Sequence, residues 1–248
     1  MLIDTHCHLN SDEPNIEDSI KDIFKNNIAK IIVNGYDLVS NQKAILLAEK
    51  YPSIYAAVGY HPSVANEITN QELEVLNKLL LHPKVIAVGE IGLDYYYTKD
   101  NQQQQLNLLD KQLKLAVNHH LPVIIHNREA TNDLYSLLKK YKVKGVCHCF
   151  NESLEIANKF IKRGFLLGIG GIITFKNNKL KEVIKKIPLE YIVLETDSPY
   201  LAPVPFRGRP NSPKYLPYIA KKIAEIKGVD YLEVVKKTSF NVRSLFDF

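Results

Sequence analysis

Histidines and carboxylates recur along this sequence at the points where short apolar segments end. In chain order these residues are His6, His8, Glu90, His126, His148 and Asp197. Imidazole suits zinc and similar ions, whereas carboxylates also allow manganese or magnesium. A lone histidine is usually an ordinary core or surface residue, but burying six such groups together would be costly unless a metal bound them. Six ligands exceed one tetrahedral site, so we predict two divalent ions (Zn, Mg or Mn) with Glu90 as the shared ligand.

Eight apolar, β-branched segments alternate with longer amphipathic ones along the chain. They are Leu2 to Leu9, Lys30 to Gly35, Ile54 to Gly59, Val85 to Ile91, Val123 to His126, Gly145 to Phe150, Phe165 to Gly170 and Tyr191 to Glu195. This alternation is typical of βα units, and eight strands favour an α/β protein of the TIM (β/α)8 barrel class over a doubly wound sheet. Reactive groups in such a barrel lie at the carboxyl ends of the strands.

Two connecting segments carry further predictions. Gln102 to His119 is expected to be an amphipathic helix, with an apolar face formed by Leu106, Leu109, Leu113 and Val117. The proline-rich segment Ser198 to Pro217 is expected to be a long loop after the last strand, because periodic helix follows from Tyr218 onward.

The length of 248 residues fits one large domain or two small ones. The predicted ligands begin at His6 and end at Asp197 and must meet at one point. Dividing the chain would split that site. We therefore expect residues 1–248 to form a single domain.

The histidine and cysteine spacing argues against a zinc–thiolate site. Side chains two apart on a strand point to the same face, so His6 and His8 can both face the barrel axis. The same alternation turns His148 inward and both Cys147 and Cys149 outward. Structural zinc sites usually show CxxC-like spacing, which the three cysteines do not have. We expect these cysteines to be small packing residues.

Composition places few limits on the partner. Lysine and arginine number 32 against 27 acidic residues, so the net charge is +5, which favours an anionic partner only weakly. No apolar run reaches the roughly 18 residues of a membrane span. The opening residues lack a basic segment followed by a long apolar core, so we expect no secretory signal. We expect a cytoplasmic protein that does not enter the membrane, with a monomer as the default state.

Six motifs in order resemble the TatD family of metal-dependent deoxyribonucleases, in the amidohydrolase-like superfamily. They are HCH at residues 6–8, GYHP at Gly59 to Pro62, VGEIGLDYY at Val88 to Tyr96, IIHNRE at Ile124 to Glu129, HCF at His148 to Phe150 and ETDSPYLAPVP at Glu195 to Pro205. The resemblance spans nearly the whole chain and implies a TIM barrel, two divalent ions and hydrolysis of DNA phosphodiester bonds. The family's metal ligands fall on the same six residues named above. The chain departs from the family at Asn151 and Glu152 and from Phe206 to Pro213, where loops bear on substrate choice.

These assignments suggest a mechanism in which two ions hold and acidify a water molecule that attacks the phosphate. Asp197 would ligate metal and accept the proton of that water, with Glu90 as the bridging ligand. We expect His61, Arg128 and Arg207 to bind the phosphate, since a guanidinium can hold two phosphate oxygens. We expect Glu195 to lie next to the ligands and support them, and Asp94 to close the GLDY turn.

Two other functions are consistent with a barrel of this kind. One is a binuclear-metal amide or ester hydrolase acting on a small molecule. Related barrels of that kind often use a carboxylated lysine as the bridge, whereas this chain has Glu90. The other is a metal-binding barrel without catalytic activity that serves as an interaction module, and the complete ligand set argues against it. The nuclease is therefore the favoured function.

Overall fold

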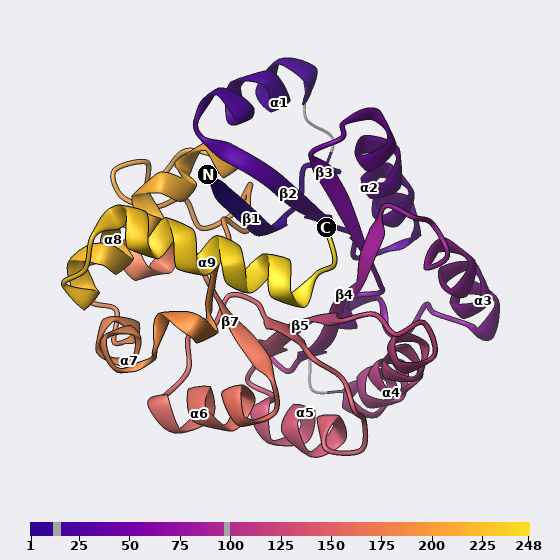
Figure 1. Ribbon diagram of the computed structural model, residues 1–248. Helices are drawn as coiled ribbons and strands as arrows, with labels where there is room; N and C mark the ends of the chain where they lie inside the picture. The colour runs from indigo at the N-terminus through magenta and orange to yellow at the C-terminus, as the bar shows by residue number, and fades with distance from the viewer. Residues whose placement is uncertain (12–15, 97–99) are drawn as a thin grey trace. The chain divides into compact units, whose positions relative to one another are not determined.

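The structure is a computed structural model that describes residues 1–11, 16–96 and 100–248 (Figure 1). Its strands are β1 (Leu2–Cys7), β2 (Ile28–Asn34), β3 (Ile54–Val58), β4 (Val85–Asp94), β5 (Val123–Arg128), β6 (Gly145–Cys147), β7 (Phe165–Ile169) and β8 (Ile192–Leu194). Its α-helices are α1 (Ile16–Lys25), α2 (Leu38–Lys50), α3 (Asn70–Leu79), α4 (Gln102–Asn118), α5 (Thr131–Leu138), α6 (Leu154–Lys162), α7 (Leu180–Lys186), α8 (Leu216–Lys227) and α9 (Tyr231–Leu245). The strands form one sheet in the order β1 to β8. This alternation confirms the predicted α/β fold of the TIM-barrel class.

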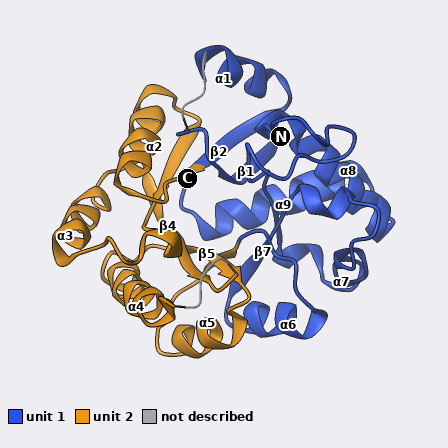
Figure 2. Cartoon of the chain, turned by 180° about the vertical axis from the view of Figure 1, so that it is seen from behind, with its two compact units in different colours: residues 1–32, 148–248 blue, residues 33–147 orange. Residues whose placement is uncertain are grey.

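The chain forms two compact units. The first comprises residues 1–32 and 148–248, and the second comprises residues 33–147 (Figure 2). The first unit holds β1, β7, β8, α1 and α6 to α9, whereas the second holds β3 to β6 and α2 to α5. Strand β2 contributes residues to both.

In the first unit the first and last strands of the sheet lie side by side. The hydroxyl of Thr5 donates to the carbonyl of Leu194 at 3.1 Å. Beyond it, Cys7 and Ser198 form a parallel bridge. Because parallel strands end at the same edge, the carboxyl ends of β1 and β8 are neighbours. The HCH motif and Asp197 are thereby brought together.

In the second unit β3 to β6 form a continuous parallel ladder. Val58 of β3 pairs with Val88 of β4, and Gly92 of β4 pairs with His126 of β5. This register places the ends of β4 and β5 at the same level. The side chains that follow these two strands can therefore form a common group.

Helix α4 buries a different face from the one predicted. Leu109 and Leu113 are buried as expected, but Leu106 is only partly buried and Val117 is 38% exposed. The other buried residues of this face are Gln105, Leu108, Gln112 and Ala116. Glutamine can occupy a buried position here because both its amide oxygen and its amide nitrogen form hydrogen bonds, as described below.

The expected loop after β8 ends earlier than predicted. Helix α8 begins at Leu216, so Pro217 lies in its first turn and not in the loop. Proline is tolerated there because the first turn of a helix does not use its backbone N–H groups. Strand β6 is also shorter than predicted, since Cys149 has a φ of 47° and leaves the extended conformation.

Burial along the strands fits the fold class. Every residue of β1 and of β4 is buried. Parallel strands covered on both faces read as nearly continuous apolar runs, which is why these segments were recognisable in the sequence. No helix within the described ranges is long and apolar enough to cross a membrane.

The single-domain organisation of residues 1–248 stays a prediction. We expect the metal-free protein to unfold in one cooperative transition, because the first unit is built from the two ends of the chain and needs both to form. Urea unfolding followed by far-UV circular dichroism and by tyrosine fluorescence tests this. Coincident curves would support one domain, and two separated transitions would contradict it.

Candidate metal centre

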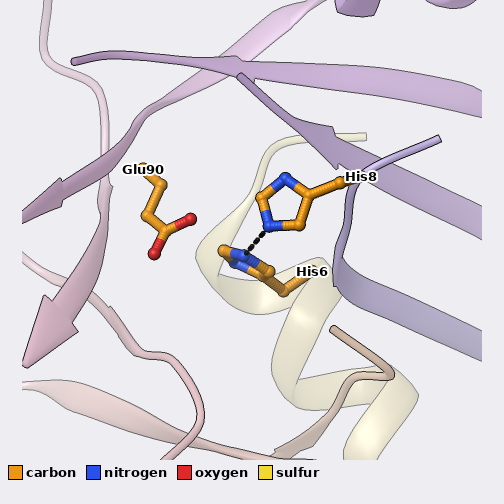
Figure 3. A group of neighbouring side chains, drawn as sticks. All are labelled: His6, His8 and Glu90. Carbon is orange, nitrogen blue, oxygen red and sulfur yellow. Dashed lines mark hydrogen bonds between the residues drawn. The ribbon is translucent and has the colours of Figure 1, made fainter. Parts of the chain in front are cut away.

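Four of the six predicted ligands gather in the first unit. His6, His148 and Asp197 each offer a ligand atom, and these atoms lie within 4.8 Å of one another. The Nε2 atoms of His6 and His8 are 3.2 Å apart (Figure 3). The Oδ1 atom of Asp197 lies 3.7 Å from Nε2 of His6 and 3.5 Å from Nε2 of His8. Three imidazoles and one carboxylate converging in this way form a donor set that suits zinc and similar divalent ions.

Asp197 is held in an unusual backbone conformation just past β8. Its φ is 57°, and its amide donates to the carbonyl of His6 at 2.8 Å. Burial alone would raise the pKa of Asp197, but the hydrogen bond with His8 and the nearby imidazoles of His6 and His148 hold it below its ordinary value of 3.8. The side chain is therefore a carboxylate at neutral pH, able to bind a cation or accept a proton.

Asp4 ties β1 to the segment that follows β8. Its Oδ1 accepts hydrogen bonds from the amides of His6, at 3.2 Å, and Thr196, at 3.0 Å. Burial raises the pKa of Asp4 to about 7, although hydrogen bonds from Thr196 and His6 oppose the shift. Sequence reasoning missed this residue. The available signal was a carboxylate within the apolar segment, two residues before His6.

Glu195 lies beside the predicted ligand His148. It is fully buried, its Oε1 lies 3.9 Å from Nδ1 of His148, and it accepts a hydrogen bond from the amide of Cys149. A carboxylate beside the second nitrogen of a ligating histidine orients the ring. Gly168 makes room for it, because a Cβ at that position would lie 2.1 Å from Oε2 of Glu195.

Replacing Gly168 with alanine should impair the first group without preventing folding. The added methyl group must displace the buried carboxylate of Glu195, so we expect destabilisation of about 1–3 kcal/mol and a loss of turnover of about 10²-fold. Alanine at Gly170 provides a control for the stability measurement, because its φ is -106° and a Cβ there would lie 3.7 Å from the nearest atoms, which belong to the same Glu195. Unfolding free energy and turnover are the readouts, and wild-type values for both would contradict the proposed close fit.

The second unit contains a group formed by His61, Glu90 and His126. Their ligand atoms also lie within 4.8 Å of one another. His126 is placed between two carboxylates, with Nδ1 2.8 Å from Glu90 and Nε2 3.0 Å from Asp94. Asp94 also accepts from the amide of Tyr96 at 2.9 Å, so it both closes the turn and contacts the site. The bridging role of Glu90 stays a prediction.

The two carboxylates change the charge of His126. Burial alone would lower its pKa, but the hydrogen bonds with Asp94 and Glu90 outweigh burial and raise the pKa to about 9. Without a metal ion, the imidazole is therefore protonated at neutral pH. Metal binding requires that this proton leave.

We expect the metal-free protein to lose stability as the pH rises from 6.5 to about 9. The folded chain binds the His126 proton more tightly than the unfolded chain, so the contribution is fully present below the ordinary pKa of 6.5 and is lost as the pH passes the folded value. The difference corresponds to at most about 3 kcal/mol. Urea unfolding at a series of pH values measures it, with His126→Gln as the control. Parallel pH profiles for the two proteins would contradict the assignment.

The hydrogen bonds of His61 determine which of its ring nitrogens carries the proton. Its Nδ1 accepts a hydrogen bond from the backbone amide of Ser63 at 3.1 Å. An amide nitrogen only donates, so the neutral ring carries its proton on Nε2. That nitrogen lies 3.7 Å from Oε1 of Glu90. It thus presents a donor beside the second group, and phosphate binding by His61 stays a prediction.

Two buried glutamines of α4 hold the strand ends of this unit. Gln112 accepts from the amide of Tyr60 at 2.7 Å and donates to the carbonyl of the same residue at 2.9 Å. Gln105 contacts the amide and carbonyl of Asp94 in the same way, both at 2.9 Å. Sequence reasoning missed both residues. Their signal was two polar residues seven apart on the buried side of a helix.

Two predicted phosphate contacts are arginines held against aromatic rings. The guanidinium of Arg128 lies 3.6 Å from the ring centre of Tyr96. That of Arg207 lies 4.1 Å from the ring centre of Phe175 and donates to the carbonyl of Ala202 at 3.1 Å. These contacts fix each guanidinium plane. Phosphate binding by either arginine stays a prediction.

The cysteines do not take part in these groups. Within the described ranges, the metal-capable clusters are made of histidine, aspartate and glutamate. Cys7 is fully buried, and its Sγ lies 3.7 Å from the carbonyl of Ile32. It is a packing residue, as expected from strand alternation.

A parallel α/β barrel whose strand ends carry groups of histidine and carboxylate defines a metal-dependent barrel enzyme. The chain belongs to the TatD family: the model of that family, described as TatD related DNase, matches residues 3–247. It is 41% identical to the uncharacterized metal-dependent hydrolase YabD of Bacillus subtilis, over 99% of each chain. The protein is thus a metal-dependent hydrolase of this family.

Solved structures agree with this assignment. YjjV, a TatD homolog from Escherichia coli, superposes with a TM-score of 0.92 at 35% identity, covering 100% of this chain and 98% of that one. A TatD family hydrolase from Entamoeba histolytica gives a TM-score of 0.89 at 26% identity, covering 99% and 97%. Fold and family are therefore supported along the whole length.

Proposed function

We propose that this protein is a deoxyribonuclease that hydrolyses phosphodiester bonds of DNA with two divalent metal ions. The observation that carries the proposal is the pair of histidine–carboxylate groups, one in each unit, at the ends of strands. The family description, TatD related DNase, supports the substrate class. The reaction belongs to the hydrolases that act on ester bonds.

The ligand set that we propose uses all six residues predicted from the sequence. His6, His8, His148 and Asp197 form one group, and Glu90 and His126 belong to the other. We propose Glu90 as the shared ligand, and Zn, Mn or Mg as the ion, because the donors are nitrogen and oxygen. Divalent ions bound there would lower the pKa of water and neutralise charge on the phosphate.

The chain's own residues would perform the remaining tasks. Asp197, a carboxylate at neutral pH, would accept the proton of the attacking water. The Nε2–H group of His61 would donate to a phosphate oxygen. Arg128 and Arg207 would hold further phosphate oxygens through their guanidinium groups. In this proposal the residues orient the phosphate and keep it from rotating before attack.

Reconstitution with metal and an assay on DNA test the proposal. Chelator-treated protein, loaded separately with Zn²⁺, Mn²⁺ or Mg²⁺, would be incubated with end-labelled single- and double-stranded DNA. We expect cleavage only after loading, and none from Asp197→Asn prepared identically, which controls for a contaminating nuclease. Small amides and esters form parallel arms. Hydrolysis of these compounds without DNA cleavage would replace the nuclease with the small-molecule hydrolase.

The cytoplasmic location and the monomeric state stay predictions. The location and the absence of membrane binding are inferred from the sequence, whereas the monomer is the default state. Cell fractionation and light scattering after size-exclusion chromatography are the corresponding measurements. A stable dimer or a membrane-bound fraction would contradict them.

A further inference from the structure

An exposed tyrosine lies next to the metal-capable group of the first unit. The side chain of Tyr200 is 62% exposed, and its ring centre is 6.2 Å from that of His8, with the planes at 67°. The ring offers a flat aromatic surface beside the place where the phosphate would bind.

The backbone of Tyr200 is fixed although its ring is exposed. Its amide donates to the carbonyl of Asp197 at 2.8 Å, and its carbonyl accepts from the side chain of Asn211 at 2.6 Å. The amide of Asn211, a buried residue, binds the carbonyl of Thr196 at 2.7 Å as well. The ring is therefore carried on a segment that is anchored to the metal-capable group itself.

This segment adopts a conformation that ordinary residues avoid. The φ angles are 57° at Asp197 and 53° at Leu201, so positive-φ residues flank Tyr200 on both sides. Such angles are uncommon outside glycine and, for a leucine, are unfavourable. These two residues fix the path of the backbone before and after the tyrosine, whose ring remains in solvent.

We propose that Tyr200 stacks against the base of a nucleotide that adjoins the cleaved phosphate. This inference rests on the proposed nuclease function and names the part of the substrate that the exposed ring recognises. Every base has a flat π-face, and aromatic side chains bind bases by stacking without a hydrogen-bond code. The role is substrate positioning, so it resides in the ring and not in the hydroxyl group.

Three variants separate stacking from other roles. Tyr200→Ala removes the ring, Tyr200→Phe removes only the hydroxyl, and Tyr191→Ala is a matched control in the same unit. Tyr191 is 37% exposed and precedes β8, whereas Asp197 follows it, so the two lie at opposite ends of that strand. Each protein would be assayed with its metal content measured, on DNA and on DNA carrying an abasic nucleotide on either side of the cleaved bond in turn.

We expect Tyr200→Ala to lower kcat/KM on intact DNA by about 5- to 150-fold, with Tyr200→Phe and Tyr191→Ala close to wild type. One of the two abasic substrates lacks the base that stacks on Tyr200. On that substrate, the wild type and Tyr200→Ala should cleave at equal rates, because the stacking partner is absent. If Tyr200→Ala slows the cleavage of intact and abasic DNA by the same factor, the substitution has only disturbed the loop, and the proposal is wrong.

The remaining outcomes are also decisive. If wild type cleaves DNA and Tyr200→Ala is equally active, stacking is wrong and the nuclease function stands. If Tyr200→Phe loses as much as Tyr200→Ala, the hydroxyl acts and stacking is wrong. If metal-loaded wild type neither binds nor cleaves DNA, the nuclease function and the base contact are both wrong.

Discussion

Replacing Asp197 with asparagine should reduce turnover by about 10³-fold or more while the protein remains folded. The substitution removes the negative charge that lies 3.5 Å from His8 and 3.7 Å from His6, and with it the group that accepts the proton. Asparagine tolerates the φ of 57° at this position, as aspartate does. The loss should therefore appear in turnover and not in the unfolding free energy.

A second aspartate of the first unit offers a matched control. Asp230 caps helix α9 by accepting from the amide of Leu232 at 2.7 Å, and asparagine caps helices equally well. Asp230→Asn should leave turnover and stability unchanged. Full activity of Asp197→Asn, with normal stability, would remove Asp197 from the proposed role.

Removing one histidine from each group should leave each variant with about one metal ion. His148→Gln affects the group of the first unit, and His126→Gln affects the group of the second. Because each group has its own imidazole and carboxylate donors, loss of a ligand from one should spare most of the binding by the other. We expect close to two ions in the wild type, and a loss of turnover of about 10²-fold or more in each variant.

Metal analysis after gel filtration measures the stoichiometry, and His82→Gln is the control. His82 contacts Glu49 at 3.0 Å and belongs to neither group. A wild type that holds a single ion, or two variants that each lose all metal, would contradict the proposed binding of two ions. Stability measured on the same samples shows whether either variant has unfolded.

Much of the fold could be predicted because parallel strands are apolar along their length. Each of the eight predicted segments overlaps a strand, with ends shifted by a few residues. The ends shifted where local geometry intervened, as at Cys149, whose φ of 47° ends the extended segment. A pattern of hydrophobic residues carries no information on such turns. Element type was therefore easier to predict than element length.

The site could be predicted in part, since its ligands share a position at the strand ends. The residues that hold those ligands in place were harder to find, because their partners are distant backbone groups. Asp4 binds the amide of Thr196, 192 residues away along the chain, and Gln112 binds Tyr60, 52 residues away. Folding alone creates these pairs. The buried face of α4 was mispredicted for the same reason, since its glutamines resemble surface residues in sequence.

The protonated His126 has a consequence for the protein before it meets a metal. Glu90 and Asp94 both contact this imidazole, and two carboxylates facing a neutral ring would repel each other in a buried place. The proton thus balances part of this negative charge and keeps the three side chains together in the metal-free protein. Binding of a metal ion at this group therefore displaces the proton of His126. Metal uptake should release protons into the medium, and a lower pH should weaken metal binding.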